Sequence, residues 1–154
     1  MRSAPRAALL AALTGLVAAL TPTAASAAPA CPVAPAAADE SALTAMINQS
    51  RRSEGVAQVA RDKVLRAAGR RKSMAMAGGG AFAHTAGGKL PWANGRAAGQ
   101  NIAMADSAAA AFQGMLESPG HRQNMLAGDW RYAGVGAALR CDGMLFVTIN
   151  FMAP

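Results

Sequence analysis

The sequence has no apolar run at its start long enough to cross a bilayer as a permanent helix. The run at residues 7–20 is about 14 residues long, whereas a membrane-spanning helix needs roughly 20. Two arginines precede this run and small residues follow it as far as Ala27, which is the three-part pattern of a secretory signal peptide. We therefore predict export and cleavage near Ala27. A lipoprotein anchor at Cys31 is the alternative, although residues 28–30 lack the large aliphatic residue that such signals usually carry.

Cysteine is scarce, with only Cys31 and Cys141 in the chain. Export would place both residues where disulfides persist, so we predict that they pair. Such a bond would join the N-terminal arm to the last hairpin and stabilise the fold by up to about 4 to 5 kcal/mol in the chain-entropy model. Two unpaired thiols are the alternative.

The sequence shows no internal repeats, and its length does not require a second domain. Without the leader at 1–27, roughly 125 residues remain, enough for one domain with a single core. Residues 28–38 are alanine and proline with almost no large apolar side chain, which indicates an extended arm. We expect the domain to occupy residues 39–154 and to be a monomer.

Acidic residues are few, with 8 against 15 basic residues and a net charge of +7. Without the two leader arginines, 13 basic residues remain, many of them in residues 51–72. Lys63, Arg66 and Arg70 follow the spacing of one helix face. This face is either merely solvated or contacts anionic envelope polymers or lipid headgroups. No nucleic-acid-reading motif accompanies the charge, so we do not predict a nucleic-acid partner.

Apolar spacing predicts three helices. The first begins near Asp39 and ends by Gly55, and the second begins near residues 61–62 and ends at the three glycines 78–80. Val64, Leu65 and Ala68 are expected to face inward on the second helix. A third helix begins at Ser107, and Ser118-Pro119 ends it and begins a short fourth one.

Between the second and third helices, residues 78–99 show no sustained period, which indicates a long surface segment, and long loops in compact domains are usually functional. The C-terminal part alternates apolar and smaller residues on both sides of Asp142-Gly143, a dipeptide that favours a tight turn. The two runs should pair as an antiparallel hairpin with one face against the helices. The predicted class is α+β.

The segment SPGHR at 118–122 carries the most chemistry. Serine suits an N-cap and proline the first helical position, so His121 falls in the first turn, where the helix field disfavours imidazolium. Neutral imidazole can bind a metal or accept a proton. A hydrogen-bonded structural histidine is the alternative. No serine or cysteine has a recognisable base partner.

Several short segments together resemble the CAP superfamily, the secretory proteins named for cysteine-rich secretory, antigen 5 and pathogenesis-related members. FAHT at 82–85 resembles the family's aromatic-Ser-His segment, and GQNIA at 99–103 resembles its Gly-Glu-Asn-Ile-Ala segment. SPGHR, with Asn124 after it, is similar to the hallmark of the bacterial branch. Three further short matches occur in the same order as the corresponding segments of the family: INQ at 47–49, GV at 55–56 and GVG at 134–136.

This resemblance implies an α-β-α sandwich with a small antiparallel sheet and a cleft where two histidines, matched here by His84 and His121, meet acidic residues. Some members bind a divalent metal there, so His84 and His121 could bind zinc or magnesium, although no cofactor is required. Gln100 stands where glutamate is usual, and an amide is neither basic nor negatively charged. Two imidazoles and an amide would make a weak zinc site.

Other positions depart from the family pattern or support its structure. The second acidic position has no match, with Asp106 and Glu117 the nearest carboxylates, and Met115 replaces a tryptophan. We assign Asn101 and Asn124 to structure, because a buried amide can bridge two backbones through its donor and its acceptor.

Three functions follow from these residues. The first is a non-catalytic extracellular module that binds an envelope glycan, a lipid or a protein through a cleft with His84, Gln100 and His121. The second is a metal-assisted hydrolase that uses both histidines. In the third, the histidines are purely structural and link helix to loop.

Overall fold

The computed structural model describes residues 31–86 and 90–154. The predicted cleavage site at Ala27 and the first part of the arm, 28–30, lie outside the described residues. In the described ranges no helix is both long and apolar enough to cross a membrane.

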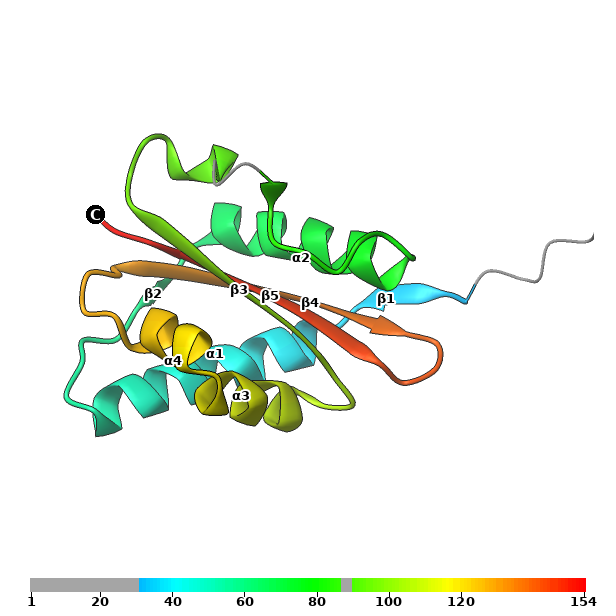
Figure 1. The fold of residues 1–154 in the computed structure, drawn as a ribbon, viewed down its shortest axis with the longest axis horizontal. Coiled ribbons are helices and arrows are strands. Elements are labelled where there is room, and N and C mark those ends of the chain that lie inside the picture. The colour runs from blue at the N-terminus through cyan, green and yellow to red at the C-terminus, as the bar shows by residue number, and fades with distance from the viewer. Residues whose placement is uncertain (1–30, 87–89) are drawn as a thin grey trace, which may run out of the picture.

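A mostly antiparallel sheet forms the middle layer of the domain (Figure 1). Its strands lie in the order β1-β4-β5-β3, and the short β2 pairs in parallel with β4. Their bounds are Val33–Pro35 for β1, Ala60–Arg61 for β2, Ala98–Ala105 for β3, Tyr132–Arg140 for β4 and Leu145–Met152 for β5. Strand β3 therefore forms one edge of the sheet.

Helices cover both faces of this sheet (Figure 1). Helix α2 packs on one face against β4 and β5, whereas α1, α3 and α4 cover the other face. Their bounds are Ala37–Ser53 for α1, Lys63–Ala77 for α2, Ala108–Glu117 for α3 and Pro119–Leu126 for α4, with a short 3-10 helix η2 at Pro91–Ala93. The α-β-α sandwich implied by the resemblance is confirmed.

Two glycines on β4 allow α2 to approach the sheet closely. A Cβ atom at Gly134 would overlap the backbone of Leu65 and Arg66, and one at Gly136 would overlap the backbone of Gly69 and Arg70. No other residue lacks the Cβ atom, so glycine is required at both positions. The predicted GVG segment is therefore a packing surface for the helix.

The C-terminal hairpin forms as predicted, with β4 and β5 antiparallel and Gly143 at a positive φ of 86° in the turn. The expectation that only one face would meet helices was wrong. All eight residues of β5 are buried, because the sheet is covered on both sides and has no solvent face at this strand.

Two local predictions also need correction. Ordered structure begins before Asp39, since β1 lies inside the predicted arm and α1 starts at Ala37. Val64 does not face inward but is 54% exposed, whereas Leu65 is fully buried. Asp62 is the N-cap of α2, with its side chain accepting from the backbone of Val64 and Leu65. Val64 lies one position before the buried stripe, which runs through Leu65, Gly69, Ser73 and Met76.

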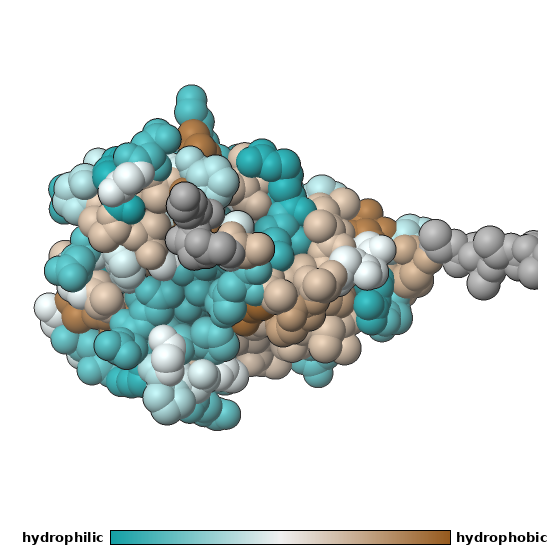
Figure 2. Space-filling view, turned by 45° about the horizontal axis from the view of Figure 1, so that its top comes forward, coloured by the Kyte–Doolittle hydropathy of each residue, from teal (hydrophilic) through white to brown (hydrophobic). Residues whose placement is uncertain are grey.

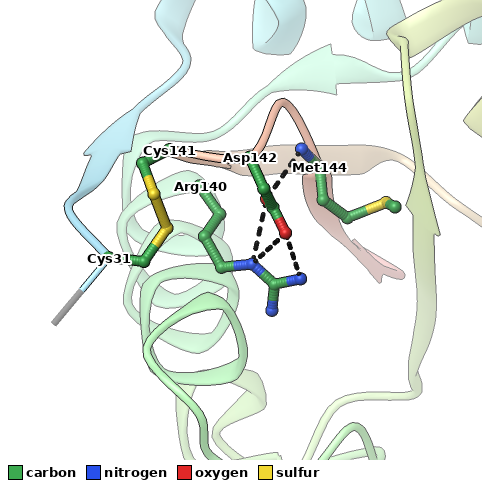
Figure 3. Close-up of a disulfide and its surroundings, with 5 residues drawn as sticks. All are labelled: Cys31, Arg140, Cys141, Asp142 and Met144. Carbon is green, nitrogen blue, oxygen red and sulfur yellow. Dashed lines mark hydrogen bonds and ion pairs between the residues drawn. A yellow bond between two sulfur atoms is a disulfide. The ribbon is translucent and has the colours of Figure 1, made fainter. Parts of the chain in front are cut away.

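A disulfide joins Cys31 to Cys141 across a sequence separation of 110, with their Cα atoms 5.5 Å apart (Figure 3). Next to it, the Arg140 guanidinium donates to both carboxylate oxygens of Asp142 and lies over the Phe146 ring. The disulfide therefore attaches β1 to the end of β4, as we expected for an exported chain.

Candidate ligand cleft at the edge of the sheet

Edge strand β3 forms hydrogen bonds to the His84 loop from one of its faces and to the helix of His121 from the other. Consecutive residues of a strand point to opposite faces. Gln100 accordingly bonds to the loop that carries His84, and Asn101 bonds to the helix that carries His121. The pair Gln100-Asn101 thus brings together histidines that are 37 positions apart in the sequence.

Gln100 uses both ends of its amide. Its Oε1 accepts from the backbone N–H of Thr85 at 2.9 Å, and its Nε2 donates to Oδ1 of Asn150 at 2.9 Å. The direction of the bond to Asn150 is fixed, because Nδ2 of Asn150 donates to the Leu65 carbonyl, which can only accept. A glutamine, and not a glutamate, satisfies both neighbours of this position.

Asn101 and Asn124 join the same strand to α4. Nδ2 of Asn101 donates to the backbone carbonyl of His121 at 3.0 Å, and Nδ2 of Asn124 donates to Oδ1 of Asn101 at 2.8 Å. The Asn124 carboxamide also lies against Gly99, where a Cβ atom would overlap it. The structural role assigned to both asparagines agrees with these bonds.

His121 lies in the first turn of α4, after Pro119 at the first helical position. Ser118 is the N-cap residue, but its side chain makes no capping hydrogen bond, contrary to our expectation. Ser118 lies at the junction of α3 and α4, where its backbone N–H donates to the Gly114 carbonyl and its own carbonyl accepts from the backbone of Arg122. Proline sets the start of the helix here without help from the serine hydroxyl.

The pKa of His121 is lowered from its ordinary value of 6.5, first because the ring is partly buried and second because of the charge on His84. Burial disfavours the charged imidazolium. The second cause requires that the two imidazoles lie close enough for their charges to interact. His121 is therefore neutral at pH 7.

Neither imidazole ring makes a hydrogen bond with another described residue; only the backbone of His121 takes part in the amide network. His84 is exposed and His121 is half-buried. In the part of the chain that the structure describes, both rings are thus free to contact a ligand.

An apolar groove of about 340 Å³ begins at His121 and runs between β3 and α3. Its walls include Phe82, Met104 and Met115. The first two are half exposed, at 49% and 50%, while Met115 belongs to the core. Phe82 is held in place by an edge-to-face contact with Phe146. On the face shown in Figure 2, hydrophilic residues gather in the middle and apolar residues toward the β1 end.

The donor set of this cleft does not fit a zinc site. Zinc in proteins normally takes three or four ligands from histidine, cysteine and carboxylates, and no group of three such residues occurs within residues 31–86 and 90–154. Gln100 has both amide atoms engaged, and Asp106 and Glu117 are exposed and do not join the histidines.

Sequence reasoning missed Thr85 and Asn150, which connect the His84 loop to the sheet through Gln100. It also missed strand β3, whose residues 98–105 are mostly small. A signal for Asn150 was present, since it and Thr148 are the polar residues of a mostly apolar and fully buried strand. Buried amides require partners.

Comparison with known proteins places this arrangement in context. A model of the cysteine-rich secretory protein family, called CAP, matches residues 44–151, which is more than half of the chain. No curated protein sequence matches the chain.

Solved structures with the same fold come from several organisms. An outer surface protein from Borrelia burgdorferi is 15% identical with a TM-score of 0.67, and the alignment covers 75% of this chain and 92% of that one. An extracellular SCP-domain protein from Bacillus anthracis is 25% identical with a TM-score of 0.66, covering 77% and 41% of the two chains. A cysteine-rich secretory protein from Staphylococcus aureus is 13% identical with a TM-score of 0.59, covering 77% and 39%. The chain thus spans about two fifths of the last two proteins.

Proposed function

Because the chain belongs to the cysteine-rich secretory protein (CAP) family, we propose that it is an extracellular binding module and not a hydrolase. The leader-like N-terminus, the disulfide between Cys31 and Cys141 and the extracellular description of the Bacillus anthracis protein support the location. Fold alone does not assign function, so the choice between binding and catalysis depends on the cleft.

The observation that carries this proposal is the combination of two free imidazoles with a fully engaged amide. A general base is usually oriented by a third group, and in a hydrolase of this type a carboxylate would do so. Gln100 cannot take a proton, and it already serves Thr85 and Asn150. The cleft can therefore donate and accept hydrogen bonds to a ligand, whereas no carboxylate among its described residues joins the histidines to orient an imidazole as a general base.

The shape of the groove favours one kind of ligand. Its volume lies at the lower end of the range for small-molecule sites, which are mostly apolar with a few polar groups. An apolar chain or side chain would lie against Phe82 and Met104, while a hydrogen-bonding group would reach His121 at the other end. Among the envelope glycans, lipids and proteins that the sequence allowed, an amphiphile or an apolar peptide segment fits best.

The proposal is tested by titrating the isotope-labelled mature chain, residues 28–154, with dodecanoate and with soluble cell-wall glycan while recording NMR spectra. We expect dodecanoate to shift the signals of Phe82 and His121. Phe82→Ala should weaken its binding about 10-fold or more, because burial of an aromatic side chain contributes roughly 1.5 to 3 kcal/mol.

Val64→Ala provides a matched control, since Val64 is a similarly exposed apolar side chain on α2, outside the groove. This variant should bind like the wild type. Release of product from cell-wall substrates, lost in His121→Ala and without any measurable ligand binding, would replace binding with hydrolysis as the function.

A further inference from the structure

Helix α2 carries five basic residues and no acidic one, the highest concentration of one charge sign in the described chain. Lys63, Arg66 and Arg71 are exposed. Arg70 is partly covered, since it pairs with the buried carboxylate of Glu40. Because the buried face of the helix packs on glycines of β4, these cations gather on the outer surface.

The same cations line two neighbouring hollows. The first, about 160 Å³, lies beside β2 and the start of β4 and is lined by Arg61, Lys63 and Arg66, together with α1 and β4. The second, about 410 Å³, follows along α2 and is lined by Arg66, Arg70 and Arg71. Arg66 borders both hollows, so they are neighbours on the surface, and we call the two together the basic groove.

The carboxylates in this groove are already engaged. Glu40 accepts from Arg70 and from the backbone of Ala137, and Asp62 caps the N-terminus of α2. Within the described ranges, no carboxylate forms an ion pair with Arg61, Lys63, Arg66 or Arg71. In these ranges, four cations of the groove therefore lie outside any ion pair.

From this juxtaposition we propose that the basic groove, from Arg61 to Arg71, binds an extended polymer that carries regularly spaced phosphodiester groups. The guanidinium group matches phosphate in a two-pronged geometry, and arginine outnumbers lysine in the groove. Lys63 and Arg66 lie about one helical turn apart, near 5.4 Å, which suits a chain whose charges repeat.

Two other anionic partners fit the groove less well. A nucleic acid would gain from aromatic side chains on which its bases stack, and neither hollow has an aromatic residue in its lining. A membrane surface would meet the outward face of α2, which supplies every residue of the second hollow, but it could not enter the first hollow, whose walls come from α1, β2, α2 and β4. Phosphodiester groups on a flexible chain can reach both hollows.

This surface is separate from the histidine cleft. The cleft lies at the β3 edge of the sheet, whereas the first hollow lies beside β2 and the start of β4, on the far side of β5 from β3. The two share no lining residue, so the polymer site does not depend on the function proposed for the cleft.

The test uses the mature chain with fluorescein-labelled linear polyphosphate and records anisotropy at several salt concentrations. With four cations engaged, affinity should fall about 50-fold between about 50 and about 200 mM salt. The double variant Arg66→Gln/Arg71→Gln should reduce this dependence to about 7-fold. Both residues are exposed and outside the described ion pairs, so folding should be unaffected, as thermal unfolding would verify.

Arg52→Gln/Arg96→Gln is the matched control, because it removes the same charge from exposed positions that do not line the groove. It should keep the 50-fold dependence. Equal losses in both double variants would show that only net charge matters and would overturn the site. Absence of polyphosphate binding would also overturn it, as would stronger binding to single-stranded DNA or to phosphatidylglycerol vesicles than to polyphosphate.

Discussion

Helix α1 and strand β3 both bury polar side chains, but α1 buries charges and β3 buries or half-buries amides. Near the start of α1, Glu40 is 3% exposed, and near its end Arg51 is completely buried. On β3, Gln100 and Asn101 occupy comparable positions beside the cleft. The two sets differ in how their hydrogen-bonding capacity is met.

An amide has a donor end and an acceptor end, so one residue can bridge two unlike neighbours. Gln100 does this between Thr85 and Asn150. A guanidinium has only donors. Two of the three nitrogens of Arg51 donate to the carbonyls of Ala57, Met125 and Ala127.

Its remaining nitrogen, Nη2, has no partner in the described residues, and burial lowers the pKa of Arg51. The amides thus position the cleft at little electrostatic cost. The charged Arg51 of α1 links this helix to the end of α4, but its burial has a higher electrostatic cost.

The largest effect is expected from Arg51→Ala. The variant would leave three carbonyls without their donor and would open a cavity in the core, so the free energy of unfolding should fall by about 4 kcal/mol. Urea unfolding measures this change. Arg52→Ala is the control, because Arg52 follows Arg51 directly in the sequence but is exposed. This variant should lower the free energy of unfolding by less than about 0.5 kcal/mol. Similar losses in the two variants would contradict the distinction between buried and exposed charge.

A smaller loss of stability is expected from Gln100→Glu, which replaces one of the amides with a charged carboxylate. A carboxylate oxygen would face Oδ1 of Asn150, and Asn150 cannot turn without losing its bond to Leu65. The free energy of unfolding should fall by about 1 to 3 kcal/mol, again measured with urea.

Gln113→Glu, on the exposed surface of α3, makes the same chemical change and should be nearly neutral. Unchanged stability of Gln100→Glu together with new micromolar zinc binding would mean that the amide network is not needed.

The smallest effect concerns pH, because His121 is only half-buried. Its folded pKa lies below 6.5, so the unfolded chain binds the proton more readily. Stability from the neutral ring is fully present above pH 6.5 and decreases as the pH falls below it. Thermal unfolding between pH 7.5 and pH 5.5 should show this decrease in the wild type and less of it in His121→Gln.

The contribution of His84 to that shift can be isolated by NMR titration. His84→Gln removes a positive charge near His121, so the pKa of His121 should rise toward 6.5. An unchanged pKa would mean that burial alone causes the shift and that the two rings do not interact.

Much of the fold could be predicted from local signals. The ends of α1 and α2, the hairpin around Gly143 and the restart of the helix at Pro119 each depend on a glycine, a proline or an apolar period that acts within a few residues. Strand β3 was missed because its mostly small residues give no clear alternation. The exposure of Val64 was missed because the buried stripe of the helix includes Gly69 and Ser73, which give no apolar signal for the face that packs on the sheet.

The candidate site was predicted only as a set of residues. His84, Gln100 and His121 were identified through resemblance, and the network of Thr85 and Asn150 that explains the glutamine was not. Those bonds join positions up to 85 residues apart, and no local pattern encodes such distances.

The sequence by itself determined the helices and the C-terminal hairpin, because the propensities of glycine, proline and apolar residues act over a few positions. It also provided the basic composition of α2. Only the tertiary structure decided which edge of the sheet carries the histidines, why an amide is needed beside them and where the cations of α2 form a groove. Each of these depends on contacts between distant segments, which form when the sheet brings those segments together.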